Sequence, residues 1–287
     1  MHKFSRRGFA ALLAVSALLP GAALAADALK EIRIDWATYN PVSMVLKQKG
    51  LLEKEFAKDG IGIVWVQSAG SNKALEFLNA GSIDFGSTAG SAALVARING
   101  NPIKSVYVYS RPEWTALVTT KDSKIASVAD LKGKLVSVPF GSSEPAIQRL
   151  RAVMAQAEVE EGAKLFYRKA DANTWGILNV REEFLKAHPD IVRRVLATYE
   201  EARKYSLANY DELKKTFIAV TKLPDAVVDK QLKERTELTH SRIGAPQRES
   251  ILAAGLALQQ AGVIDAKTDV KAALDALIDD QVPLPTN

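Results

Sequence analysis

The segment Ala80–Ala96 reads AGSIDFGSTAGSAALVA and contains three different patterns in a row. Ile83-Asp84-Phe85 alternates apolar and polar residues as a strand does, and Ser91–Ile98 has the apolar spacing of a helix. Between them, Gly86–Gly90 (GSTAG) has no side chain larger than threonine. A strand that passes through a turn into a helix is a building unit of α/β folds, and the small residues indicate that some group approaches this backbone closely.

The segments before and after this one repeat the same order of strand and helix. Strands alternating with helices predict an α/β fold with a mostly parallel sheet that is covered by helices on both faces. The predicted strands are Ile32–Trp36, Ile63–Val66 and Ile103–Tyr109, and the predicted helices are Val42–Ala57, interrupted at Gly50, and Asn72–Asn79.

The second half begins with further strands and then becomes helical. The strand-like segments are Trp114–Thr120, Leu135–Val138 and Thr174–Val180. A short helix with a serine cap is predicted at Ser127–Leu131, and a longer one from Pro145 to about Glu161. The remaining predicted helices are Pro189–Leu207, Tyr210–Val220, Pro224–Glu234, Ala245–Gln260 and Val270–Ile278.

The first residues have the pattern of a cleavable export signal. Met1–Ala25 has a basic head, an apolar run and a small-residue cleavage site at Ala23-Leu24-Ala25. The head Ser5-Arg6-Arg7-Gly8-Phe9 matches the twin-arginine signal of bacteria, and an ordinary secretion signal with two arginines is the alternative. The sequence therefore predicts export to the periplasm, with cleavage near Ala25.

Composition excludes several classes of protein. Removal of the signal takes away Lys3, Arg6 and Arg7, which lowers the formal charge from +5 to +2, too little for a nucleic-acid partner. The chain has no cysteine, so disulfides and thiolate metal sites are excluded. We expect a soluble mature protein of about 260 residues that holds no metal and no cofactor.

Small hydroxyl-rich segments follow three of the predicted strands, at Gln67–Asn72, Gly86–Ser91 and Gly141–Ser143. In an open parallel sheet, ligands bind outside the carboxyl ends of the strands, where loops lead into helices. A helix start offers unpaired backbone N–H groups, and hydroxyls add further donors, so several such turns around one cleft can bind an anion. Helix capping alone is the alternative explanation for each turn.

An enzymatic role has weaker support. GSTAG has threonine where a nucleophile elbow needs serine, and the three histidines have no metal-site spacing. Asp84 and Glu144 are the plausible general bases, and for Asp84 a satisfied polar link between strands is the favoured role. Lys73 and Arg111 are the nearest cations to the predicted turns, and Arg111 is expected to pair with Glu113.

Three segments carry a resemblance to a known family: ATYNPVSMVLKQKGLLEKEF, SAGSNKALEFLNAGSIDFGSTAGSAALVA and DANTWGILNVREEFLKAHPDIVRRVL. They resemble the periplasmic substrate-binding proteins of ABC importers for aliphatic sulfonates, which are relatives of the nitrate- and taurine-binding proteins. The resemblance implies a two-lobed clamshell of type II with a helical C-terminal part. It also implies a monomeric protein that takes part in sulfur metabolism. Such a protein closes on a small anion and delivers it to a membrane permease.

Position by position, the resemblance implies a set of ligand-binding residues at matching loops. Two tryptophans among them could contact an alkyl or aryl tail, and a core role is the alternative for both. The set is Tyr39, Asn40, Ser68, Gly70, Ser71, Thr88, Gly90, Trp114, Ser142, Ser143 and Trp175.

The chain departs from the family pattern in its second lobe, where AIQRLRA runs directly into VMAQAEVEEGAKLFYR and one βα unit is missing. The predicted divisions are an export signal (1–25), the first part of lobe one (26–112), a shortened lobe two (113–180) and a helical return segment on lobe one (181–287). The alternatives that stay open are binding of nitrate, taurine, bicarbonate or a neutral pyrimidine precursor, an exported enzyme, and a degenerate paralogue that binds a partner protein.

Overall fold

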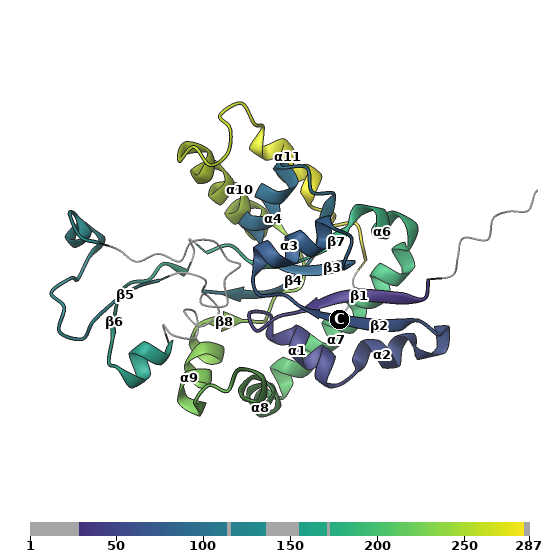
Figure 1. Cartoon of the computed structure of the whole chain (residues 1–287), viewed down its shortest axis with the longest axis horizontal. Coiled ribbons are helices and arrows are strands. Elements are labelled where there is room, and N and C mark those ends of the chain that lie inside the picture. Colours follow the sequence, from purple (N-terminus) through teal and green to yellow (C-terminus); the bar gives the residue numbers. More distant parts are fainter. Residues whose placement is uncertain (1–28, 114–115, 136–154, 171–172, 284–287) are drawn as a thin grey trace, which may run out of the picture.

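The computed structural model describes residues 29–113, 116–135, 155–170 and 173–283 (Figure 1). The predicted export signal, with its twin-arginine motif and cleavage site, lies outside the described residues. In the described part of the chain, no helix is both long and apolar enough to cross a membrane.

The centre of the described structure is a mixed six-stranded sheet with the strand order β2-β1-β3-β7-β4-β8. Strands β1, β2 and β3 run parallel, as predicted, whereas β7 returns between β3 and β4 and is antiparallel to both. The predicted α/β class is confirmed, with the return strand making the sheet mixed. The bounds are β1 Glu31–Trp36, β2 Gly62–Gln67, β3 Phe85–Ala89, β4 Ile103–Pro112, β7 Gly176–Arg181 and β8 Thr236–Glu237.

The small residues that follow Phe85 form a strand, and the prediction of a turn over Gly86–Gly90 was wrong. Strand β3 contains Gly86, Ser87 and Thr88, and it lies inside the sheet between β1 and β7. Helix α4 (Gly90–Ile98) begins directly after it. A side chain at Gly86 would place its Cβ 2.8 Å from Leu78 Cδ1, so the segment is small because a helix packs tightly against this strand.

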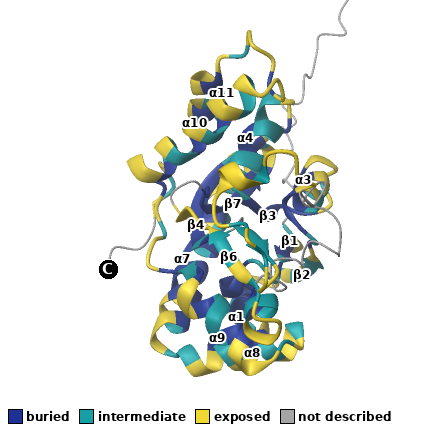
Figure 2. Cartoon of the chain, turned by 90° about the vertical axis from the view of Figure 1, so that its left-hand side faces the viewer, coloured by how far each residue is buried: buried dark blue, intermediate teal, exposed yellow. Residues whose placement is uncertain are grey.

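Helices cover both faces of the sheet (Figure 1). Above it in that view lie α3 (Ser71–Asn79), α4, α10 (Ala245–Gln260) and α11 (Val270–Leu277), and below it lie α1 (Pro41–Gln48), α2 (Leu51–Phe56), α7 (Pro189–Ala208) and α8 (Tyr210–Thr221). Each layer has its own apolar core against the sheet. Figure 2 shows the buried residues where helices meet strands and the exposed ones on the outer helix surfaces.

Local signals in the sequence explain several element boundaries. Gly50 adopts the left-handed conformation with φ 59° and separates α1 from α2, as predicted. The carboxylate of Asp269 accepts a hydrogen bond from the Ala272 amide and caps α11. The short 3₁₀ helix Val128–Leu131 starts at a capping box between Ser127 and Asp130, which confirms the predicted serine cap.

The other elements join these layers. Helix α6 (Glu182–Ala187) follows β7, and α9 (Asp225–Asp229) continues into a π-helical turn at Lys230–Glu234. The sequence predicted one helix over Pro224–Glu234, and the structure divides it between these two geometries.

A separate two-stranded sheet lies outside the six-stranded one and pairs β5 (Leu117–Thr119) with β6 (Lys164–Tyr167). It forms the extension at the left of Figure 1. None of the residues of these two strands is fully buried. This region therefore has little apolar core among its described residues, and the predicted division at residues 113 and 180 stays a prediction.

Charged contacts attach this extension to the larger part of the molecule. Arg168 donates two hydrogen bonds of 2.6 Å to Glu113 and one of 2.8 Å to the carbonyl of Glu234. Glu158 forms ion pairs with Lys230 and Arg235. Glu113 thus pairs with Arg168, and its pairing with Arg111, which the sequence suggested, stays a prediction.

Candidate functional site

The carboxyl ends of β1, β2 and β3 meet at one edge of the sheet because these strands are adjacent and parallel. Each strand leads there toward the start of a helix, at Pro41, Ser71 and Gly90 respectively. This edge is where open α/β sheets bind ligands. The structure brings together here seven of the residues predicted to bind a ligand, namely Tyr39, Asn40, Ser68, Gly70, Ser71, Thr88 and Gly90.

A buried carboxylate organises this edge. Asp35, the penultimate residue of β1, accepts hydrogen bonds from the hydroxyl of Ser68 (2.5 Å) and from the hydroxyl of Ser87 (2.8 Å). The Ser87 amide also donates to both carboxylate oxygens, at 3.0 and 2.9 Å. Tyr39 donates to the Ser87 carbonyl (2.9 Å) and lies 3.0 Å from Ser68 Oγ, and Asn40 donates to Ser87 Oγ (2.8 Å). Strands β1, β2 and β3 are therefore linked through one carboxyl group.

Every hydrogen bond to Asp35 comes from a neutral donor. The side chain is fully buried, and burial raises its pKa to about 6, although the hydrogen bonds from Ser68 and Ser87 act in the opposite direction. Burial dominates because the low dielectric disfavours the charged form of a carboxyl group. Asp35 therefore changes its protonation state within the physiological pH range.

Asn40 connects this network to a helix start and to the core. Its side-chain oxygen accepts from the Ser43 amide at 3.1 Å and caps α1. Its Nδ2 lies 3.4 Å from the hydroxyl of Tyr199 on α7. Burial and, second, the charge of Asp35 raise the pKa of the Tyr199 hydroxyl far above its ordinary value. Tyr199 thus stays neutral beside the carboxyl group.

Ser71 and Thr88 use their hydroxyl oxygens as acceptors inside the fold. Ser71 Oγ accepts from the Ala89 amide at 3.0 Å, which ties the start of α3 to the end of β3. Asn179 on β7 donates to Thr88 Oγ1 at 2.8 Å. Both side chains are buried. Each hydroxyl keeps a hydrogen that it can donate, so their role in ligand binding stays a prediction.

The two predicted glycines have structural reasons for their size. Gly70 precedes α3 with φ 138°, a conformation that favours glycine. The Gly90 amide donates to the Trp175 carbonyl at 2.9 Å. A Cβ at Gly90 would lie 2.6 Å from Cγ1 of Ile251, so a close contact with α10 excludes bulk at this position.

Trp175 belongs to the apolar core beneath α4, α10 and α11, and only 3% of it is exposed. Its ring faces the Arg111 guanidinium at 5.0 Å and the His240 ring at 4.7 Å. Arg111 also lies 3.9 Å from Glu237. The structure thus supports the core role that the sequence left open for this tryptophan. Trp114, Ser142 and Ser143, the other predicted ligand residues, lie outside the described residues.

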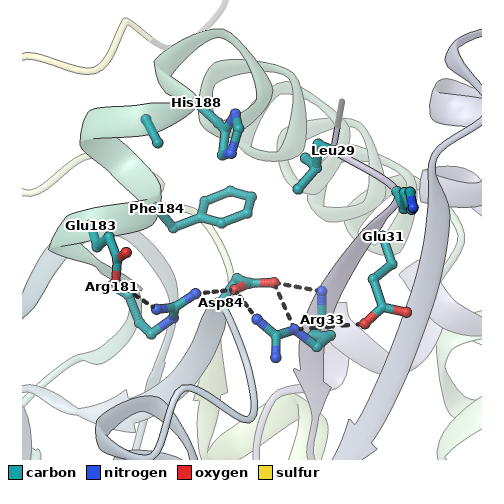
Figure 3. A pocket seen from close by; sticks show the side chains of 10 residues that line it. Leu29, Glu31, Arg33, Asp84, Arg181, Glu183, Phe184 and His188 are labelled. Atoms are coloured by element: carbon teal, nitrogen blue, oxygen red, sulfur yellow. Dashed lines mark hydrogen bonds and ion pairs between the residues drawn. The ribbon is translucent and has the colours of Figure 1, made fainter. Parts of the chain in front are cut away.

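The opposite edge of the sheet contains a second buried carboxylate, Asp84 (Figure 3). Arg33 donates to it from its backbone amide at 2.8 Å and from its guanidinium at 3.0 Å, and Arg181 donates at 2.7 Å. The three side chains line an open pocket of about 250 Å³ together with Phe184 and His188. Asp84 is therefore a satisfied link between strands, as the sequence favoured, and its pairing with two arginines argues against a role as general base.

Asp35, Ser87, Asn179 and Tyr199 are the residues of this network that sequence reasoning missed. The signal for Asp35 was present in Ile32–Trp36, where an aspartate near the end of a strand directly precedes a predicted ligand loop. Ser87 was read as part of a turn, and Asn179 and Tyr199 lie in the strand and helix that return from the far end of the chain. Among the described residues, no cluster of three histidine or acidic side chains has metal-binding geometry.

Comparison with known proteins identifies relatives along most of the chain. The NMT1/THI5-like family model matches residues 47–164. A protein of Bacillus subtilis (strain 168), provisionally named as an aliphatic sulfonates-binding protein, is 25% identical over 318 residues, which cover 94% of this chain and 95% of the relative. A protein of Escherichia coli (strain K12) with the same provisional name is 33% identical over 144 residues, which cover 50% of this chain and 44% of that protein.

The chain is similar to two proteins that are provisionally named as aliphatic sulfonates-binding proteins. The family resemblance inferred from the sequence is thereby confirmed. The alignment of this chain with the Bacillus protein spans 318 positions, more than the 287 residues of the chain. The Bacillus protein therefore contains residues that have no counterpart here, in agreement with a shortened chain.

Solved structures confirm the predicted fold class. The periplasmic aliphatic sulphonate binding protein SsuA from Escherichia coli superposes with a TM-score of 0.73 and 19% identity, covering 90% of this chain and 94% of that one. The alkanesulfonate-binding protein SsuA from Xanthomonas axonopodis pv. citri, bound to MOPS, gives a TM-score of 0.71 and 21% identity, covering 85% and 97%. This chain thus has the fold of a periplasmic binding protein.

Proposed function

We propose that this protein is the periplasmic solute-binding component of an ABC importer and that it captures an aliphatic sulfonate or a similar small organic anion. The observation that carries the proposal is the match to a provisionally named sulfonate-binding protein over nearly the full length of both chains. The shared fold with the two SsuA structures supports it. The partner is a membrane permease, the protein acts as a monomer, and neither nucleic acid nor a cofactor takes part.

The site for the anion is the carboxyl edge of β1, β2 and β3. Helix starts and hydroxyl groups converge there from the loops after β1 and β2 and from the junction of β3 with α4, and such groups bind anions without a cationic side chain. Lys73, one of the two nearby cations, is engaged by Glu76 at 2.7 Å. The predicted residues Ser142, Ser143 and Trp114 belong to the opposing lobe in this proposal, and closure of the two lobes over the anion creates the form that the permease receives.

Reversible binding without turnover is the proposed chemistry. Of the two general bases considered, Asp84 pairs with two arginines at the opposite edge of the sheet, and Glu144 lies outside the described residues. Export through a cleaved signal, by the twin-arginine route, completes the proposal and places the mature protein in the periplasm.

Thermal unfolding of the purified mature protein tests this function. We expect a linear alkanesulfonate to raise the melting temperature, because a ligand that binds only the folded state stabilises it, by about 2.7 kcal/mol at a hundredfold excess over Kd. The panel contains alkanesulfonates, taurine and nitrate, and mass spectrometry of each ligand after incubation reports turnover. No shift with any member would remove the proposal, and conversion of a ligand would replace it with an enzymatic role.

A pair of tyrosine variants locates the site. Tyr39→Phe removes the hydroxyl that contacts Ser68 and Ser87, and we expect it to weaken sulfonate binding about tenfold, the cost of roughly one hydrogen bond to a charged group. Tyr205→Phe removes a hydroxyl from α7 whose ring lies 3.9 Å from Lys49, away from this edge, and serves as the matched control. Equal affinities of the two variants would place the site elsewhere.

A further inference from the structure

The edge proposed to bind an anion already contains a buried carboxyl group. Asp35 has no solvent exposure, and the Ser68 hydroxyl is its direct neighbour at 2.5 Å. A negative charge at this position repels a bound anion strongly, because screening by water is weak in a buried site. The hydrogen-bond donors around Asp35 determine how the site can hold the anion next to this carboxyl group.

The hydroxyl hydrogens at this edge point inward when Asp35 is ionised. A serine hydroxyl has one hydrogen, and those of Ser68 and Ser87 are donated to the two carboxylate oxygens of Asp35. The tyrosine hydroxyl also has one hydrogen, and Tyr39 donates it to the Ser87 carbonyl. In this state the hydrogens of the Ser68, Ser87 and Tyr39 hydroxyls are donated to groups of the protein, and an anion cannot accept them.

Addition of one proton from solvent to Asp35 reverses the direction of the hydrogen bond between Asp35 and Ser68. The new O–H group on Oδ2 donates to Ser68 Oγ, whereas Oδ1 continues to accept from Ser87. The Ser68 hydrogen then turns away from the carboxyl group and is donated outward, directly or through Tyr39 at 3.0 Å. No covalent bond between heavy atoms changes, and the negative charge behind the site disappears in the same step.

We propose that Asp35 is a positioning residue whose protonation turns the Ser68 and Tyr39 hydroxyls toward the bound anion, so that the protein takes up one proton with each anion. This inference rests on the proposed function of the same site. It extends that function by linking capture of a permanently charged ligand to pH.

The other groups that face Asp35 do not exchange protons in the relevant range. The neighbours are Ser68 from the loop after β2, Ser87 from β3, Tyr39 and Asn40 from the loop after β1, and Tyr199 from α7. The buried pair Glu200 and Arg203 lies behind Tyr199, next to Tyr107, whose ring centre is 5.6 Å from that of Tyr199. Burial raises the pKa of Asp35 to about 6, so its ionisation falls between pH 5 and 8.

Isothermal titration calorimetry of the mature protein with hexane-1-sulfonate tests the linkage, because this ligand stays ionised throughout. We expect the affinity to fall about tenfold for each pH unit above about pH 6, the limit for one coupled proton. Measurements in two buffers of different ionisation enthalpy should show uptake of nearly one proton per ligand at about pH 8. Binding that is independent of pH, without proton uptake, overturns the linkage and leaves the proposed function intact.

Variants assign the linkage to Asp35. In Asp35→Asn the amide nitrogen can donate to Ser68 as the protonated acid does, so we expect tight binding at about pH 8 and no proton uptake. Ser68→Ala removes the relay, and its binding should be weak at every pH. His240→Gln is the control, because it removes an imidazole that contacts Trp175 and makes no hydrogen bond to Asp35.

The outcomes separate the two proposals. Loss of the pH dependence in His240→Gln, or its retention in Asp35→Asn, would assign the proton to another group and overturn the role of Asp35. Failure of the unaltered protein to bind any sulfonate at any pH would overturn the proposed function and the linkage together.

Discussion

Two aspartates, Asp35 in β1 and Asp84 directly before β3, are buried at opposite edges of the same sheet, and their surroundings differ in charge. Asp84, at the amino edge beside β3, is held by the guanidinium groups of Arg33 and Arg181. Asp35, at the carboxyl edge of β1, receives hydrogen bonds from neutral groups alone. The two aspartates are equally buried, but only the charge of Asp84 is balanced by cations and stabilises the fold. The charge of Asp35 is not balanced, so its protonation state is suited to change.

The largest loss of stability is expected at Asp84, whose charge is balanced by two arginines. Asp84→Asn leaves the two arginines without their shared counter-charge, and we expect it to lower the free energy of unfolding by about 3 kcal/mol near neutral pH. Urea denaturation measures this loss. The estimate is at the lower end for buried pairs because the Arg33 side chain is 31% exposed. A loss below about 1 kcal/mol would show that solvent, and not Asp84, balances these arginines.

The same substitution at Asp35 should have the opposite sign above pH 6. The pKa of Asp35 is about 6 in the folded protein and about 4 in the unfolded chain, so the folded state holds the extra proton between these values. Stability from this proton is complete below about pH 4 and is lost as the pH rises through about 6. Asp35→Asn does not ionise, and we expect it to be about 3 kcal/mol more stable than the unaltered protein at pH 8.

Urea denaturation across the pH range checks this expectation. The difference between Asp35→Asn and the unaltered protein should shrink toward about pH 4, where both side chains are neutral. A difference that is constant with pH would mean that geometry, and not ionisation, sets it. Asp84→Asn measured in parallel supplies the contrast in sign.

A smaller effect separates packing from ligand binding at the carboxyl edge. Gly90→Ala places a methyl group about 2.6 Å from the Ile251 side chain, and we expect it to cost about 1–2 kcal/mol of stability. Ile251→Ala in the same molecule should recover part of that loss, because it makes room at the contact. The free energies of unfolding of the two single variants and the double variant give the coupling. Additive losses would contradict a direct contact between these positions.

The helical half of the fold could be predicted closely from the sequence, and the sheet less so. Helix α10 has the predicted bounds Ala245–Gln260, because Gly244 precedes it, Pro246 lies in its first turn, and it is rich in alanine, leucine and glutamine, which favour helices. Strand β3 was misplaced because its Gly86 and Ala89 are of types depleted in strands, and the close packing of α3 against Gly86 is a tertiary contact. The antiparallel order of β7 depends on contacts between residues distant in sequence, which local patterns do not contain.

The site was predictable in its location but not in its chemistry. The loops after β1 and β2 lie at one edge as predicted, because parallel strands align their carboxyl ends, whereas the predicted turn after β3 is part of the strand and Gly141–Ser143 lies outside the described residues. Asp35 was missed because a single aspartate in an alternating strand has the same pattern as one that faces water. Its burial is visible only once Ser68 and Ser87 are brought to it from β2 and β3.

The position of β7 has a consequence for how the chain can vary in length. Gly176 at the start of β7 pairs with Ser110 near the end of β4, so the chain leaves the large sheet and re-enters it at neighbouring points. The segment between these points is an insertion into the sheet whose two ends are paired with each other. A change of length between these two points does not shift a strand of the large sheet, so this chain can differ in length there from the Bacillus protein and keep the same sheet.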